Sequence, residues 1–129
     1  MIKKILIIDD SPIARKMLKS CLPKDKGYEL CEAADGEEGI RKYLEFVPDL
    51  TFMDLTMPKL DGYQAIDAIR KLDKDAIIVV STADIQRESM SRVINAGVFS
   101  VLRKPMKSKF VQEILIRVEA EKKKRAGGE

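Results

Sequence analysis

Residues 4–12 read Lys-Ile-Leu-Ile-Ile-Asp-Asp-Ser-Pro, and this stretch decides the fold class. Its four consecutive aliphatic residues are typical of a strand that is buried on both faces of a parallel sheet. The acidic pair Asp9–Asp10 ends the apolar run. Ser11 and Pro12 then form a helix start signal, because serine caps a helix and proline suits its first turn. The stretch therefore predicts a buried strand that leads directly into a helix.

The same succession of a short apolar run and an amphipathic helix occurs five times along the chain. The predicted strands are Lys4–Asp9, Tyr28–Ala33, Leu50–Met53, Ala76–Ser81 and Val98–Leu102. Apolar residues at helical spacing predict the core-facing sides of the five helices: Ile13, Met17, Leu18 and Cys21; Ile40, Tyr43, Leu44 and Val47; Ile66, Ile69 and Leu72; Met90, Val93 and Ile94; Phe110, Val111, Ile114, Leu115 and Val118.

This (βα)₅ order predicts an α/β fold, a doubly wound five-stranded parallel sheet with helices on both faces, because each crossover is right-handed. Part of a barrel is the competing arrangement. Five units in 129 residues cannot close an eight-stranded barrel, which typically takes about 250 residues. In an open sheet of this kind, sites form beyond the carboxyl ends of the strands.

Composition narrows the function classes. The sequence has no apolar run of the roughly 20 residues that a membrane span needs, so we expect a cytoplasmic protein without a membrane span. It has no histidine, which excludes a Ser-His-Asp triad and a histidine-ligated zinc site. Cys21 and Cys31 lack metal-ligand spacing and are interpreted as buried thiols.

The net charge of +3 is concentrated near the C-terminus, in the basic run Lys122–Arg125. We expect one domain over residues 1–121 and a basic, flexible tail over residues 122–129. A basic tail can contact nucleic acid, but a solvated helix end is the favoured interpretation, so a nucleic-acid partner is not expected.

Ionisable and hydroxyl side chains collect at the carboxyl ends of four predicted strands. These are Asp9 and Asp10, Asp54, Ser81 and Thr82, and Lys104. A sheet in the order 2-1-3-4-5 would place the first and third strands side by side and so bring the three aspartates together. Their mutual repulsion requires a bound proton or a cation. Oxygen ligands alone favour Mg²⁺, or Mn²⁺ in its place.

A phosphoryl-transfer site accounts for this set of residues. An aspartate carboxylate can act as a nucleophile toward phosphorus. Lys104 can pair with a phosphate oxygen as a point charge, and the Thr82 hydroxyl can donate a hydrogen bond to another. Positioning and electrostatics then supply most of the catalysis.

Several motifs occur in a fixed order along the chain. They are Ile5–Pro12, Ala34-Asp35-Gly36, Met53–Gly62, Ser81-Thr82-Ala83, Ala96-Gly97 and Lys104-Pro105. Together they resemble the receiver domain of bacterial two-component response regulators, over residues Lys4 to about Glu119. The resemblance implies the flavodoxin-like fold with the strand order 2-1-3-4-5.

The resemblance also implies a role for each matched residue. Asp54 is expected to accept the phosphoryl group, with Thr82 and Lys104 as its catalytic partners. Asp10, Asp54 and the backbone carbonyl of Thr56 are expected to ligate Mg²⁺ directly, and Asp9 through water. The peptide bond before Pro105 is expected to be cis, because that turn aims Lys104 into the pocket.

The expected partners follow from the same resemblance. The phosphoryl donor would be a phosphohistidine on a sensor histidine kinase or on a phosphotransfer protein. The output would be altered binding of a downstream protein at the face formed by the fourth helix, fifth strand and fifth helix. Such a protein catalyses only its own phosphorylation and dephosphorylation. Chemotaxis and an intermediate phosphorelay step are both open.

We expect a single-domain response regulator with no effector domain after residue 129. A receiver fragment of a longer regulator is one alternative. A nucleotide- or flavin-binding module on the same fold is another, but such a module uses a Gly-rich loop after the first strand, and residues 10–15 contain no glycine. An aspartate-nucleophile phosphatase is set aside. Such enzymes carry the nucleophilic Asp at the end of the first strand and a second Asp two residues further on, whereas Asp9 and Asp10 here are adjacent.

One position departs from the family pattern. Many receivers carry an aromatic residue three positions before the lysine, and here that position is Val101. Phe99 is expected on the same face of the strand by the two-residue period. Its favoured interpretation is a core aromatic.

Overall fold

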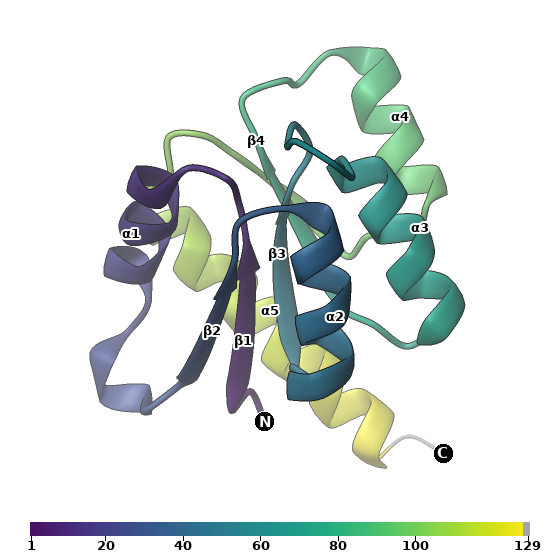
Figure 1. The fold of residues 1–129 in the computed structure, drawn as a ribbon. Helices are drawn as coiled ribbons and strands as arrows, with labels where there is room; N and C mark the ends of the chain where they lie inside the picture. The colour runs from purple at the N-terminus through teal and green to yellow at the C-terminus, as the bar shows by residue number, and fades with distance from the viewer. Residues whose placement is uncertain (128–129) are drawn as a thin grey trace.

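Five short apolar segments pair in parallel to form the central sheet of the computed structural model, which describes residues 1–127. The strands are β1 (Lys4–Ile8), β2 (Glu29–Ala33), β3 (Leu50–Asp54), β4 (Ile78–Thr82) and β5 (Ser100–Arg103). Their order in the sheet is β2-β1-β3-β4-β5, and every pairing is parallel. The predicted fold class and strand order are therefore confirmed (Figure 1).

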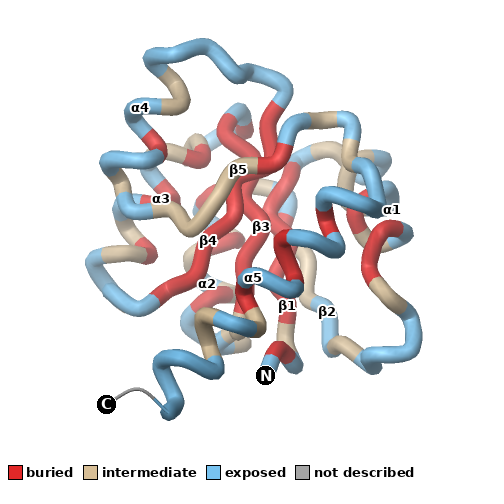
Figure 2. Tube along the Cα trace, turned by 180° about the vertical axis from the view of Figure 1, so that it is seen from behind, coloured by how far each residue is buried: buried red, intermediate tan, exposed pale blue. Residues whose placement is uncertain are grey.

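Helices cover both faces of the sheet. They are α1 (Pro12–Cys21), α2 (Gly36–Phe46), α3 (Gly62–Leu72), α4 (Arg87–Asn95) and α5 (Ser108–Gly127), with a short 3₁₀ turn η1 (Lys24–Lys26) before β2. Residues of α1 and α5 join one hydrophobic cluster, and residues of α2, α3 and α4 join the other. Figure 2 shows the result, buried strands at the centre and exposed outer helix surfaces.

Side-chain caps begin three helices at the carboxyl edge of the sheet. Ser11 accepts a hydrogen bond from the Ala14 backbone and caps α1, as predicted. Asp35 caps α2, and Asp61 forms a capping box with Gln64 at the start of α3. Each cap satisfies a backbone N–H that a helix N-terminus leaves without an intrahelical partner. The caps fix where the chain turns from strand to helix beside the predicted site.

Several residues predicted to face the core are exposed. They are Ile13, Met17, Leu44, Val47, Leu72, Ile94 and Phe110. Val47 and Leu72 lie at helix ends, and Val47 has already left α2 with a positive φ of 50°. The others flank the buried stripe, because one residue turns a helix by about 100° and the sheet buries a narrow band of each helix. Helical periodicity therefore predicted the correct core-facing side of each helix, but it assigned too many residues to that side.

The basic run predicted as a flexible tail is part of a helix. Helix α5 continues through Gly127 without a break at residue 121. Lys122 pairs with Asp49 at 3.2 Å, and Arg125 pairs with Glu121 at 2.8 Å and donates to the Asp75 carbonyl at 2.9 Å. These contacts hold the run against the end of the sheet, so residues 122–127 are helical where a tail was expected. The domain boundary at residue 121 stays a prediction. The final two residues of the predicted tail, 128 and 129, lie outside the described residues.

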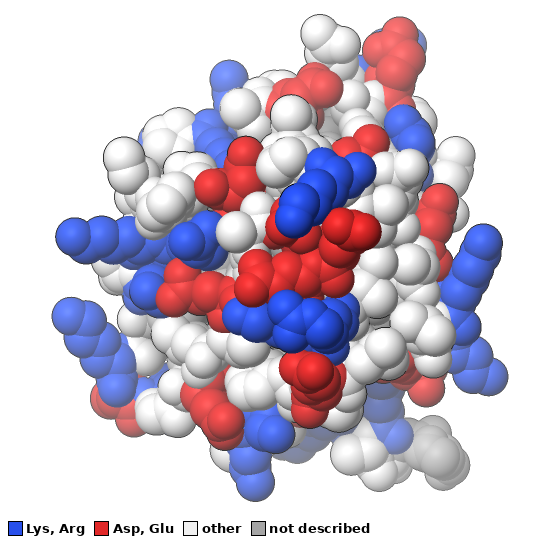
Figure 3. Space-filling view, viewed as in Figure 1, with Lys and Arg blue, Asp and Glu red and all other residues white. Residues whose placement is uncertain are grey.

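Other details agree with the sequence within a residue or two. Strands β3 and β4 each extend one residue further than predicted, to Asp54 and Thr82. The Lys104–Pro105 peptide bond is cis, as expected. None of the helices in residues 1–127 has the length and apolar character that a bilayer crossing requires. On the face drawn in Figure 3, acidic and basic side chains alternate across the middle, several as ion pairs along α2.

Candidate functional site

The register of the sheet brings the predicted site residues to one edge. Ile8 of β1 lies opposite Met53 of β3, so Asp9 and Asp54 follow side by side. Asp54 is in register with Ser81 of β4. One residue on, Thr82 is in register with Arg103, which immediately precedes Lys104. Parallel pairing thus converts four separate sequence positions into one site.

Three carboxylates form the centre of this site. One carboxylate oxygen each from Asp9, Asp10 and Asp54 lies within 4.8 Å of the others. Asp9 and Asp54 are buried, at 3% and 6% exposure, whereas Asp10 is exposed. Burial of two like charges side by side is unfavourable unless a proton or a cation joins them.

The side-chain ammonium group of Lys104 brings a positive charge to this cluster. Its ammonium nitrogen lies 2.7 Å from Asp9 Oδ2 and 3.4 Å from Asp54 Oδ1. The sequence predicted Lys104 at the site but not its contact with Asp9. Its half-buried ammonium offsets the repulsion between two buried carboxylates.

Burial and charge shift the acid–base behaviour of both groups. Burial, reinforced by the negative charge of Asp9, raises the pKa of Asp54 to about 6. Burial alone would lower the pKa of Lys104, but its hydrogen bond to Asp9 and the charge of Asp54 raise it above its usual value. At neutral pH the site therefore holds an ionised Asp54 beside a charged lysine.

The donor set suits a small hard cation. All three side chains offer carboxylate oxygen, the ligand that Mg²⁺ and Mn²⁺ prefer. Oxygens bound directly to Mg²⁺ lie roughly 3 to 4 Å apart, given metal–oxygen distances of about 2.1 Å. A spread of up to 4.8 Å fits a cation held by some of the oxygens and reached by another through water. Thr56 is exposed in the loop after β3, and its carbonyl ligand role stays a prediction.

Thr82 lies at the site and also contacts the loop that leads to α4. Its buried Oγ1 accepts a hydrogen bond from the Asp84 backbone at 3.0 Å. Asp84 in turn accepts from the Gln86 backbone at 3.0 Å and from the Ser89 hydroxyl at 2.7 Å. Because Oγ1 is the acceptor in the first bond, the Thr82 hydroxyl retains its proton for donation to a ligand.

Gly62 sets the close packing behind Asp54. Its N–H donates to the Leu55 carbonyl at 2.9 Å. A Cβ at this position would clash with the Asp54 carbonyl oxygen. Glycine therefore allows the start of α3 to lie directly against the end of β3 and fixes the backbone of Asp54.

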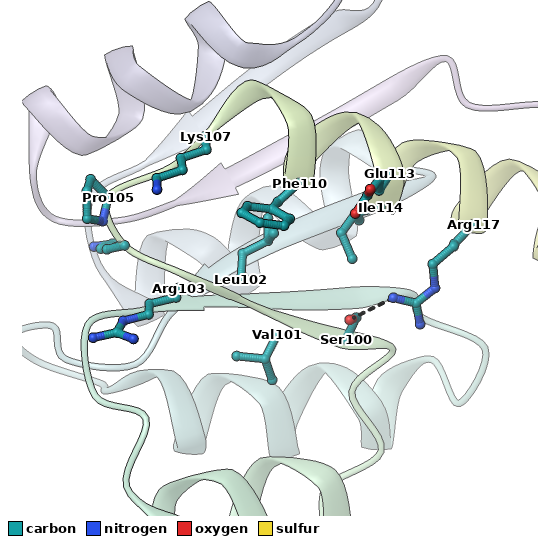
Figure 4. A pocket seen from close by; sticks show the side chains of 11 residues that line it. Ser100, Val101, Leu102, Arg103, Pro105, Lys107, Phe110, Glu113, Ile114 and Arg117 are labelled. Carbon is teal, nitrogen blue, oxygen red and sulfur yellow. Dashed lines mark hydrogen bonds between the residues drawn. The ribbon is translucent and has the colours of Figure 1, made fainter.

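Val101 and Phe99 lie on opposite sides of the sheet, which corrects the expectation that they share a face. Val101 packs with the α2–α4 side, and Phe99 packs with the α1 and α5 side, where Arg117 lies 5.3 Å from its ring centroid. Strand β5 begins only at Ser100, so the two-residue alternation does not extend to Phe99. In Figure 4 Val101 points away from Leu102 and Phe110. Phe99 is a partly buried core aromatic, as favoured.

Two residues beside the acid pair were not identified from the sequence. Arg15 Nη1 donates to the Asp9 carbonyl at 2.5 Å, and its Nε pairs with Glu32 at 2.8 Å. Arg15 belongs to a helix rich in lysine and Glu32 to an edge strand. Neither stands out by spacing or composition, so only the fold shows their relation.

Comparison with known proteins gives a consistent result. The family model of the response regulator receiver domain matches residues 5–116. The chemotaxis protein CheY of Thermotoga maritima is 40% identical over 117 residues, which cover 90% of this chain and 97% of that protein.

Solved structures agree with this match. The receiver domain of AraT from Geobacillus stearothermophilus superposes with a TM-score of 0.89 at 26% identity, covering 98% of this chain and 99% of that one. A CheX–CheY–BeF₃–Mg²⁺ complex from Borrelia burgdorferi superposes with a TM-score of 0.84 at 28% identity, covering 90% of this chain and 88% of that one.

Proposed function

Because the chain belongs to the response regulator receiver domain family, whose members are phosphoacceptors, we propose that Asp54 is the residue that accepts the phosphoryl group. The observation that carries this proposal is the position of Asp54, a buried carboxylate at the end of β3 with Lys104 3.4 Å away. Burial and the charge of Asp9 raise the pKa of Asp54 to about 6. A carboxylate with this pKa is ionised at neutral pH and basic enough to be a nucleophile.

We propose the following transfer step, which the contacts of Asp54 and Lys104 support. An Asp54 carboxylate oxygen attacks phosphorus while the bond from phosphorus to the donor breaks, and the bonding electrons stay with the donor. We propose a phosphohistidine donor on a sensor histidine kinase or phosphotransfer protein, whose imidazole then takes up a proton. Lys104 pairs with one oxygen of the transferred group, and the Thr82 hydroxyl donates to another.

Asp10, Asp54 and the Thr56 carbonyl would hold Mg²⁺, with Asp9 at or beside the metal through water, and Mn²⁺ could replace it. When bound, the ion neutralises carboxylate charge and orients the phosphoryl oxygens. We propose that catalysis by this protein is confined to its own phosphorylation and dephosphorylation.

Incubation with acetyl phosphate and Mg²⁺ tests the assignment by intact-protein mass. We expect one added phosphoryl group on the wild type and none on Asp54→Asn, which keeps the shape of the side chain. Asp67→Asn is the matched control, because Asp67 is exposed on α3 away from the site. Equal labelling of wild type and Asp54→Asn would refute the assignment.

We further propose that the output is altered binding of a downstream protein at the surface of α4, β5 and α5. This surface contains a pocket of about 710 Å³ between β5 and α5, with Phe110 among the side chains that line it and Arg103, Lys107 and Arg117 at its edges (Figure 4). The charged residues that line this pocket are Arg103, Lys104, Lys107 and Arg117 against the single acid Glu113. An acidic segment of a partner with an apolar anchor fits this chemistry.

A pull-down with and without beryllofluoride tests this output, with the bound proteins compared between the two states. We expect a partner that binds the beryllofluoride form and is lost with Phe110→Ala or Arg117→Glu. Thr82→Ala should still be labelled on Asp54 but should fail to gain that partner. Equal recovery of proteins by both forms of the wild type would contradict the proposal.

A further inference from the structure

Asp9 is held by four of its atoms at once. Its N–H donates to the Ala33 carbonyl at 3.0 Å, and its Oδ1 accepts from the Ser11 backbone at 2.9 Å. Its Oδ2 pairs with Lys104 at 2.7 Å. Its carbonyl oxygen accepts from Arg15 Nη1 at 2.5 Å. The last contact differs from the others because it fixes the peptide group that joins Asp9 to Asp10.

Arg15 is itself fixed by a carboxylate on another element. Its Nε donates to Glu32 Oε1 at 2.8 Å, and its side chain is only 17% exposed. Glu32 Oε2 accepts from Lys19 at 2.7 Å. The hydrogen bond from Lys19, together with that from Arg15, keeps the pKa of Glu32 below its usual value, so Glu32 stays ionised. Helix α1 and strand β2 thus clamp one guanidinium against the backbone of the acid pair.

The planar guanidinium suits this task. It donates from two nitrogens in fixed directions, one to a carboxylate and one to a carbonyl, whereas a lysine ammonium is a point charge on a flexible stem. Asp9 is 3% exposed, so loss of Arg15 would leave its carbonyl without this partner in a buried place. The peptide could then rotate and turn Asp10, the exposed member of the pair, away from the other two carboxylates.

We propose that Arg15, oriented by Glu32, is a positioning residue that holds the Asp9–Asp10 peptide in the pose in which both carboxylates serve a divalent cation. The inference rests on the Mg²⁺ site proposed above and adds a residue that sets its geometry. Partners that orient metal ligands typically change metal affinity by tenfold or more when they are removed.

The charge of Arg15 and its proposed positioning role predict opposite changes in Mg²⁺ affinity when Arg15 is removed, and this difference makes the inference testable. Removal of a positive charge near a cation site should strengthen Mg²⁺ binding by Coulomb's law alone. Removal of a positioning residue should weaken it. Lys16 supplies the matched control, because it is the next residue on α1, carries the same charge and is exposed.

The test is Mg²⁺ titration by calorimetry of wild type, Arg15→Ala and Lys16→Ala, with melting temperatures measured alongside. We expect Arg15→Ala to bind Mg²⁺ about tenfold more weakly, while Lys16→Ala binds it as the wild type does or slightly more tightly. Arg15→Lys keeps the charge without the two fixed donors and should also bind more weakly. Glu32→Gln should weaken binding, and its combination with Arg15→Lys should be less than additive.

If Arg15→Ala does not fold, the Mg²⁺ affinities of Arg15→Lys and Glu32→Gln decide the test. If the wild type takes up Mg²⁺ and both of these folded variants bind it as tightly as Lys16→Ala, the positioning role is wrong and the metal site stands. If the wild type takes up no Mg²⁺, both the metal site and the role of Arg15 are wrong.

Discussion

The ammonium group of Lys104 lies 2.7 Å from Asp9, closer than its 3.4 Å approach to Asp54. The lysine therefore bridges two buried carboxylates and occupies the electrostatic role that a divalent cation would share. A bound cation and Lys104 would repel each other, so on the proposed function the lysine would weaken metal binding and would pair with the incoming phosphoryl group.

Lys104→Met should separate these two effects. Loss of the lysine charge removes its repulsion of the metal, so we expect Mg²⁺ affinity to rise by about fivefold, equivalent to about 1 kcal/mol. Labelling by acetyl phosphate at saturating Mg²⁺ should fall, because the transferred group loses its ion pair. Lys71→Met, at an exposed position on α3, should change neither quantity. Weaker Mg²⁺ uptake by Lys104→Met would contradict this account.

The raised pKa of Asp54 predicts how stability depends on pH. The folded protein holds this proton up to about pH 6, whereas the unfolded chain releases it near 3.8. The folded state therefore binds more protons across this window, and ionisation of Asp54 makes the protein less stable as pH rises through it.

Asp54→Asn should remove this penalty. We expect it to raise the free energy of unfolding by about 1 to 2 kcal/mol at pH 7.5, which is the raised pKa converted to free energy and reduced for solvent screening. The gain should shrink as the pH falls from about 6 to about 4, because the folded protein keeps the Asp54 proton in this range and the penalty disappears. Urea unfolding at pH 7.5 and 4 measures both values, and a gain that grows toward low pH would contradict the assignment.

Gly62 should not tolerate a side chain. Because its Cβ would meet the Asp54 carbonyl, Gly62→Ala must push α3 away from β3. We expect a loss of about 1 to 3 kcal/mol of stability and slower labelling of Asp54. Gly127→Ala is the control, because a Cβ there meets open space. Urea unfolding and acetyl phosphate labelling measure the effects, and unchanged values for Gly62→Ala would show that the strand and helix separate at no cost.

Thr51 offers a test of the core that is independent of the site. Its hydroxyl is buried in β3 and has no hydrogen-bond partner among the described residues. Thr51→Val keeps the shape and removes the unsatisfied group, so we expect about 1 kcal/mol of added stability. Thr51→Ala removes the same hydroxyl but leaves a small cavity and should be less stable than Thr51→Val. A lower melting temperature for Thr51→Val than for wild type would show that the hydroxyl is satisfied in solution.

The sequence predicted those features that local patterns determine. Four aliphatic residues before Asp9 indicated a buried strand, and Ser11 with Pro12 indicated the helix that follows, because both signals act within a few residues. The strand ends then placed Asp9, Asp54, Thr82 and Lys104 at one edge, since parallel strands share their carboxyl side.

Features that depend on contacts between distant elements were missed. The clamp from Arg15 to Glu32 joins α1 to β2, and the contact of Lys104 with Asp9 crosses the sheet edge. The end of α5 was misjudged because Lys122 and Arg125 are held by Asp49 and by Asp75, far away in sequence. Charge patterns along the chain do not reveal such partners.

The identity of the phosphorylated residue is the most direct test of the account. Borohydride reduction after labelling with acetyl phosphate and Mg²⁺ converts an aspartyl phosphate to homoserine, which peptide mass spectrometry locates in the chain. We predict homoserine at position 54 alone, dependent on Mg²⁺ and absent from Asp54→Asn. Homoserine at Asp9 or Asp10 in the wild type, or none at position 54, would contradict the central claim.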